Sequence, residues 1–176
     1  MKNLTKVFAV AITMFGFATS SFAQANATAS ASATATIIAP IAIVKNTDMV
    51  FGNIVVQPLA AGQTVTLDAA AVANASHSPL VTLPNYGIVT PTAAEFTVTG
   101  ATDYTYTLEY PATISLAGAT GIDMSVALTC NVEKTAGVLA EGSETLYIGG
   151  TLSLGTDQVA EVYTTASDFD VTVNYN

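Results

Sequence analysis

Residues 25–37 alternate strictly between small apolar and polar side chains. The odd positions hold Ala25, Ala27, Ala29, Ala31, Ala33, Ala35 and Ile37, and every even position from 26 to 36 is Asn, Ser or Thr. Because side chains on a β-strand point to opposite faces with a period of two, the pattern predicts one long strand with an apolar and a polar face. Alanine buries little apolar area, so this strand needs a neighbouring sheet edge. That edge can belong to the same chain or to another subunit.

Alternation recurs along the rest of the chain, and helical spacing does not. The clearest runs cover residues 64–68, 95–99, 104–110, 124–132, 146–154 and 169–175. They are rich in Thr and Val and are separated by Gly, Pro, Asn and Asp, which predicts an all-β, immunoglobulin-like antiparallel sandwich. We expect one domain over residues 24–176, with residues 24–39 as an N-terminal extension or donor-type strand.

Three short segments qualify this pattern. Gly149-Gly150 lies inside an alternating run and predicts a bulge or a close approach of two backbones. Gly52-Asn53 predicts a bulge or bend within one strand, because a two-residue hairpin there would have very short arms. The Ala69–Ala75 stretch has no polar face and is expected to be a loop.

The first 23 residues have the features of a secretory signal peptide. Lys2 and Lys6 precede an apolar run from Val7 to Ala18, and residues 21–23 fit a small-x-small cleavage site. The run is too short to span a bilayer, which makes an uncleaved anchor the weaker alternative. We therefore expect a secreted protein that passes through the periplasm to an extracellular or cell-surface location, without membrane insertion after cleavage.

The charge balance limits the possible partners. Cleavage after Ala23 leaves two lysines, Lys45 and Lys134, against 13 acidic residues, and the chain has no arginine. Nucleic acids and anionic membrane surfaces bind clustered cations. The sequence therefore excludes both, and we expect self-association or an assembly chaperone as the partner.

Catalytic and metal-binding residue types are sparse. His77 is the only histidine, no Gly-x-Ser-x-Gly elbow accompanies it, and we interpret it as a solvated loop residue rather than a hydrolase base. Cys130 lies on the apolar side of its run and is expected to be a buried, inert thiol. One histidine and one inward cysteine cannot build a zinc site.

Two further alternatives use carboxylates and tyrosines. Asp168 and Asp170 share one face and could help to hold calcium, but without more oxygen ligands a charged outer face that discourages edge pairing is preferred. Tyr104, Tyr106 and Tyr110 could form a platform for sugars, but in a chain without tryptophan a half-buried core is preferred. We expect no catalytic residue, no metal and no cofactor, and a non-enzymatic role.

Several fragments occur in an order typical of one protein family. They are Ile37-Ile38-Ala39-Pro40-Ile41, Val50-Phe51-Gly52-Asn53-Ile54, Phe96-Thr97-Val98-Thr99-Gly100, Tyr147-Ile148-Gly149-Gly150-Thr151-Leu152, Tyr163 and the run from Phe169 to Asn176. Over essentially the whole chain after residue 23, this order resembles the bacterial secreted family called domain of unknown function 4402. Glu161 departs from the family pattern, which usually has glycine two residues before that tyrosine. The resemblance implies no particular activity.

A looser resemblance is to pilin subunits of the chaperone–usher type. Those subunits are small exported sandwiches that lack one strand, and an alternating N-terminal extension completes the sheet of the next subunit. Here the extension corresponds to the alternating residues up to Ile37, followed by Ile41 and Ile43. The final strand corresponds to Phe169, Val171, Val173 and Tyr175. The chain differs from many pilins in its alanine-rich extension and in having no disulfide.

Three functions are compatible with these observations. The first is a fimbria-like structural subunit that assembles by β-strand addition. The second is a monomeric extracellular binding or matrix domain whose first strand closes its own sandwich. The third, a secreted hydrolase, has the least support because no catalytic motif is present.

Overall fold

The computed structural model describes residues 26–57, 62–84, 89–156 and 158–176. The chain divides into two units, residues 1–36 and residues 37–176. Within the described ranges, all secondary structure belongs to the second unit and consists of β-strands and one short 3-10 helix, η1 (Ala140–Gly142). The described residues contain no helix with the length and apolar character of a membrane span. The expected all-β fold is confirmed.

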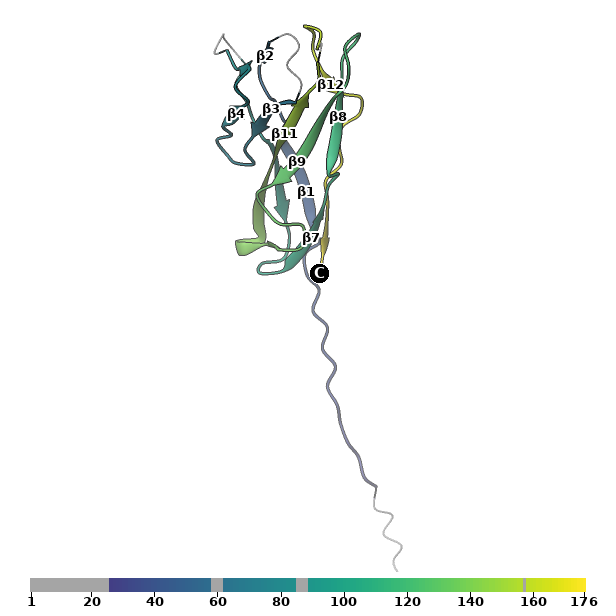
Figure 1. Ribbon diagram of the computed structural model, residues 1–176. Helices are drawn as coiled ribbons and strands as arrows, with labels where there is room; N and C mark the ends of the chain where they lie inside the picture. The colour runs from purple at the N-terminus through teal and green to yellow at the C-terminus, as the bar shows by residue number, and fades with distance from the viewer. Residues whose placement is uncertain (1–25, 58–61, 85–88, 157) are drawn as a thin grey trace, which may run out of the picture. The chain divides into compact units, whose positions relative to one another are not determined.

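One layer of the second unit is an antiparallel sheet with the strand order β1-β6-β11-β9-β8-β12 (Figure 1). The strands are β1 (Ala42–Thr47), β6 (Ala94–Thr99), β11 (Ser143–Leu154), β9 (Met124–Cys130), β8 (Thr113–Ala117) and β12 (Thr164–Thr165). The second half of β11 also pairs with β3 (Gln63–Leu67), and β3 pairs with β4 (Ala75–His77).

The facing layer is smaller. It contains β10 (Gly137–Val138), β7 (Thr105–Glu109) and β13 (Thr172–Tyr175), in that order. A separate pair joins β2 (Val55–Val56) to β5 (Val81–Thr82). Side chains of β7 and β13 pack into the same core as those of β6, β9 and β11, so the expected sandwich is confirmed.

The core follows the alternation of the sequence. In β6 and β9 every second residue is buried, and the intervening residues are largely exposed or half-buried. The fully buried large side chains are Tyr106, Leu67, Leu108, Leu139, Leu146, Ile148, Leu152, Val65, Val81, Val98 and Val126. Burying each aliphatic side chain of this kind contributes about 1.5–3 kcal/mol, so these strands hold the sandwich together.

The strand β11 explains the glycine pair. It continues through Gly149-Gly150 without a break, pairing first with β6 and then with β3 along the same edge. A Cβ at Gly149 would collide with the backbone of Leu67 and Asp68, and one at Gly150 would lie 2.6 Å from the carbonyl oxygen of Ala127. Of the two sequence-based alternatives, the close backbone approach is correct.

Two local expectations need correction. Gly52-Asn53 does not bend a continuous strand, because β1 ends at Thr47 and β2 begins only at Val55. Gly52 has a φ of 82°, a conformation that glycine adopts readily and that interrupts a strand. His77 lies at the end of β4 rather than in a loop, whereas residues 69–74 form the expected loop.

Candidate functional site

The alternating N-terminal residues that the structure describes, 26–37, form no strand. Residues 26–40 are all exposed, and β1 begins only at Ala42. Ile37 is 97 % exposed. No described strand pairs with residues 26–36, which differs from the expected strand, and Ala25 lies outside the described residues together with the whole of the expected signal peptide. Alanine side chains alone offer too little apolar area to hold such a segment in place.

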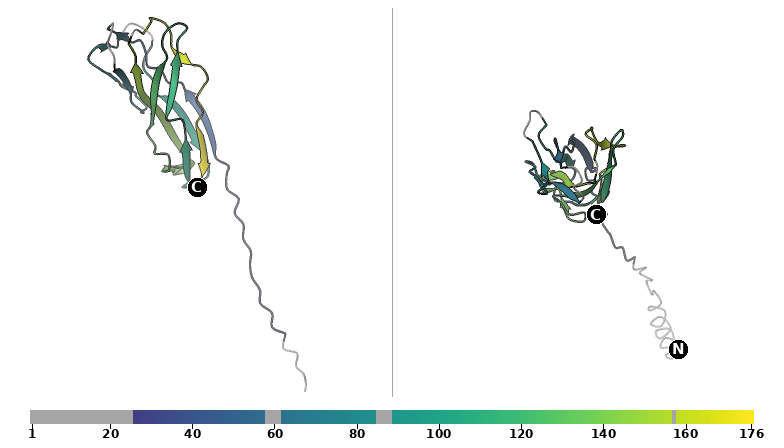
Figure 2. Two further views of the ribbon diagram at one scale, coloured as in Figure 1. Left: turned by 45° about the vertical axis from the view of Figure 1, so that its right-hand side comes forward. Right: turned by 45° about the horizontal axis from the view of Figure 1, so that its top comes forward.

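Two of the edge strands, β1 and β13, lie next to each other. Among the described residues, β1 pairs only with β6, and β13 pairs only with β7. The two strands lie side by side along one margin of the sandwich (Figure 2), and their Cα atoms approach within 8 Å. No ladder hydrogen bond joins them in the part of the chain that the structure describes. We call this margin the β1–β13 gap.

The hydrogen-bond pattern of β13 shows which of its backbone groups face the gap. The amide of Asn176 donates to the carbonyl oxygen of Thr105, and Asn174 pairs with Thr107 in the same ladder. Because successive residues of an antiparallel strand direct their backbone groups to opposite sides, those of Val173 and Tyr175 point away from β7. The free edge of β13 therefore presents N–H and C=O groups to the gap.

The same reasoning applies to β1. The amide of Gly100 donates a hydrogen bond to the carbonyl oxygen of Gly142, just before β11. The backbone groups of the preceding residue, Thr99, therefore point to the opposite side, toward its partner Ala42 in β1. The backbone groups of Ala42 point toward β6, and those of the next residue, Ile43, point into the gap. Both margins of the gap thus carry backbone groups that a further strand could pair with.

The side chains along the gap are only partly covered. They are Ile41 and Ile43 on one margin and Phe169, Val171 and Tyr175 on the other, all half-buried and packed against the core. Val173 is buried. The inward residues of the central strands β6, β9 and β11 are more completely buried, so the core is less covered along this margin than beneath those strands.

The Tyr175 hydroxyl bridges one end of the gap. It accepts a hydrogen bond from the amide of Ala101 at 2.7 Å and donates one to the carbonyl oxygen of Ala39 at 2.9 Å. A Cβ at Gly100 would collide with this hydroxyl, so glycine makes room for it. The ring of Tyr104 meets that of Tyr175 edge-on, with 5.7 Å between centroids.

Opposite charges lie at the other end of the gap. The Lys45 ammonium group is 2.6 Å from the Asp48 carboxylate. This hydrogen bond and the charge of Asp48 raise the pKa of Lys45, and the charge of Asp168 raises it further. The two margins run antiparallel to each other. Ala39, before β1, is hydrogen-bonded to Tyr175 at the end of β13, whereas Lys45, late in β1, interacts with the charge of Asp168, which precedes β13.

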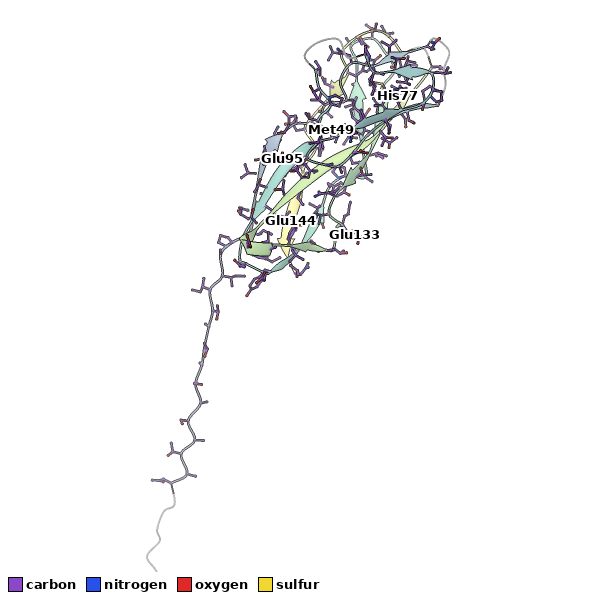
Figure 3. The ribbon with its side chains drawn as sticks, turned by 90° about the vertical axis from the view of Figure 1, so that its left-hand side faces the viewer. Met49, His77, Glu95, Glu133 and Glu144 are labelled. Atoms are coloured by element: carbon purple, nitrogen blue, oxygen red, sulfur yellow. The ribbon has the colours of Figure 1, made fainter. Side chains whose placement is uncertain are left out.

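Among the residues that the structure describes, no acidic side chain forms an ion pair with His77. Its Nδ1 atom lies 3.0 Å from the carbonyl oxygen of Ser78. Figure 3 shows His77 at the opposite end of the sandwich from Glu133 and Glu144, with Glu95 also well separated from it. The described residues therefore do not assemble the histidine–carboxylate pair that a serine hydrolase requires.

The three tyrosines do not share one surface. Tyr106 is fully buried and donates a hydrogen bond of 2.6 Å to Glu144, whereas Tyr104 is exposed and Tyr110 is half-buried. Burial raises the pKa of Tyr106 strongly, and its hydrogen bond to Glu144 raises it further. Lys134 lies over the ring of Tyr110. This arrangement offers no aromatic platform.

The other candidate ligands are dispersed. Asp168 and Asp170 are exposed and precede β13. In the described ranges, no three His, Cys, Asp or Glu residues gather in a way that could hold a metal ion. Cys130 ends β9 and is half-buried rather than fully buried, and desolvation raises the pKa of its thiol.

One polar cluster was not predicted. The Glu161 carboxylate accepts hydrogen bonds from the amides of Thr120 and Gly121, the latter at 2.6 Å, and from the Thr120 hydroxyl at 3.1 Å. It thereby ties the segment before β12 to the β8–β9 loop. The departure from the family pattern at Glu161 was the one sequence feature that marked this residue. It could not identify the partner, because Gly121 lies 40 residues away in the chain.

The comparison with known protein families gives one result. The model of the family described as "Domain of unknown function (DUF4402)" matches residues 41–175, and no curated protein matches the chain. The match includes β1, β13 and the gap between them, and it begins after the alternating N-terminal residues. The chain belongs to this family.

Proposed function

We propose that this member of the DUF4402 family is a structural subunit of a fimbria-like surface polymer. Residues 25–37 of one copy, the donor segment, add as a β-strand to the β1–β13 gap of another copy. One observation carries the proposal: the sandwich has two facing edges with free backbone groups and half-covered aliphatic side chains. The same chain carries an alternating segment, and its described residues 26–37 pair with none of the described strands.

The two parts are complementary in chemistry. The gap offers backbone donors and acceptors, and an extended segment supplies the matching groups at about 0.5–1.5 kcal/mol for each hydrogen bond. The alanine face of the donor segment would cover Ile41, Ile43, Phe169 and Val171, while its Ser and Thr side chains stay in water. Ile41 and Ile43 thus act on the acceptor side, because Ile43 pairs with Val98 within its own chain.

Export belongs to the same proposal. Removal of residues 1–23 as a signal peptide would place the donor segment at the new N-terminus, where it is free to enter a neighbour. A periplasmic chaperone could cover the gap before assembly by lending a strand of its own. The polymer would then form outside the cell or on its surface.

A monomeric extracellular binding or matrix domain is the second candidate. The close approach of β1 and β13, together with the Tyr175–Ala39 hydrogen bond, favours it because the sandwich is tied together without an added strand. In that case the N-terminal residues would be a solvated tail, and the purified protein would have the mass of one chain at every concentration.

Deletion of the donor segment tests the first proposal. We expect the chain from residue 24 to 176 to form concentration-dependent assemblies in light scattering and the chain lacking residues 24–36 to remain monomeric. A matched control keeps the composition of residues 25–36 but groups the alanines and the polar residues in two blocks, which removes the alternation. Loss of assembly in both variants supports strand addition. Equal assembly in all three chains, or in none, contradicts it.

A further inference from the structure

We infer that the Tyr175 hydroxyl is a clasp that holds the β1–β13 gap shut until a donor segment enters. This inference rests on the proposed function and adds regulation of assembly to it. A subunit in which the hydrogen bond from Tyr175 to Ala39 is intact resists addition of a donor segment.

The spacing of the two margins requires such an opening. Neighbouring strands lie about 4.8 Å apart, so a strand between β1 and β13 needs its flanking strands roughly 9.6 Å apart. Where β1 and β13 come closest, their Cα atoms already lie within 8 Å of each other. A strand can therefore pair with both margins only after they have separated.

Within the part of the chain that the structure describes, the Tyr175 hydroxyl links the two margins directly by a hydrogen bond. Its hydroxyl receives the amide proton of Ala101 and donates its own proton to the carbonyl oxygen of Ala39, so it links the end of β13 to the chain that leads into β1. Gly100 leaves the space for this contact. Separating the margins must break the bond to Ala39.

The position of Ala39 connects the clasp to both roles of the subunit. Ala39 lies two residues after Ile37, the last residue of the donor segment, and three residues before β1. Opening the acceptor gap thus changes the backbone at the base of the same subunit's donor segment. Attraction between Lys45 and Asp168 acts across the opposite end of the gap and is independent of this contact.

Removal of one oxygen atom tests the clasp. The probe is a fluorescent synthetic peptide of residues 24–38, added to the chain of residues 24–176, and its uptake rate is followed by fluorescence anisotropy. We expect Tyr175→Phe to take up the peptide several-fold faster than the wild type. Tyr104→Phe is the matched control, because it loses the same atom from the adjacent ring, and we expect the wild-type rate. An unchanged or lower rate in Tyr175→Phe overturns the clasp.

A second measurement uses only the wild-type chain and so does not depend on the folding of a variant. A carbonyl carbon that accepts a hydrogen bond resonates downfield, so the ¹³C carbonyl resonance of Ala39 should move upfield when the peptide binds. A bound peptide with an unmoved Ala39 resonance overturns the clasp but leaves strand addition intact. Absence of peptide uptake by the wild type and by both variants contradicts the proposed function itself.

Discussion

At the scale of single residues, Glu161 shows how one side chain can fix two distant segments. Its carboxylate is held by backbone amides of the β8–β9 loop, and Gly118 and Gly121 provide the space, because a Cβ at either position would collide with the side chain of Glu161 or Tyr163. Desolvation opposes the ionised form of Glu161. The hydrogen bonds from Gly121 and Thr120 outweigh that effect and lower its pKa.

This lowered pKa predicts a pH dependence of stability. A carboxyl group with a lower pKa in the folded state stabilises the fold above its unfolded pKa, near 4.5, and loses that contribution as the pH falls through the folded value. We expect the free energy of unfolding to fall between about pH 6 and about pH 3, and to fall less in Glu161→Gln. Urea unfolding at both pH values measures this. Glu133→Gln, at an exposed position, should behave as the wild type, and an equal pH response in all three chains would rule out the assigned role of Glu161.

At the scale of elements, local alternation identified the strands that bury one face. The runs that became β6, β7, β9, β11 and β13 were predicted because burial of every second residue leaves a period of two in the sequence. Alternation could not reveal which strand edges stay free, because that depends on pairing between segments far apart in the chain. It also predicted a strand at residues 25–37. The sequence there has one apolar face, but residues 26–37 pair with no strand in the described ranges.

The donor segment gives a prediction at this scale. Proline lacks the amide proton and cannot donate to a ladder, so Ala31→Pro should abolish assembly of the chain of residues 24–176 in light scattering. The free energy of unfolding of the monomer should stay within about 0.5 kcal/mol of the wild type, because the position lies outside the core. Ala31→Ser is the control that retains the amide and most of the small size, and it should still assemble. Assembly of the proline variant at the wild-type level would argue against a ladder at this position.

At the scale of the whole molecule, the core of the sandwich of residues 37–176 is only partly covered along the β1–β13 gap, while the inward side chains of its central strands are buried. The sequence predicted the sandwich class and the final alternating strand, Phe169–Tyr175, but it assigned Ile41 and Ile43 to the donor side, whereas Ile43 pairs with Val98 of its own chain. It could not predict the clasp, since the contact between Tyr175 and Ala39 joins the two ends of the fold and leaves no local pattern. A subunit with a protected acceptor and an exposed donor segment is suited to controlled polymerisation.

Cysteine trapping between two separate chains shows whether the donor segment of one chain pairs with β13 of another. In a Cys130→Ser background, one preparation carries Ser30→Cys, Ser32→Cys or Thr34→Cys, and the other carries Asn174→Cys, an exposed position on β13. Paired strands bring such residues within disulfide range. We expect a mixed disulfide-linked dimer after mild oxidation for at least one of the three donor positions. Mixed dimers no more abundant than with Ser125→Cys, an exposed position on β9, would contradict pairing of the donor segment with β13.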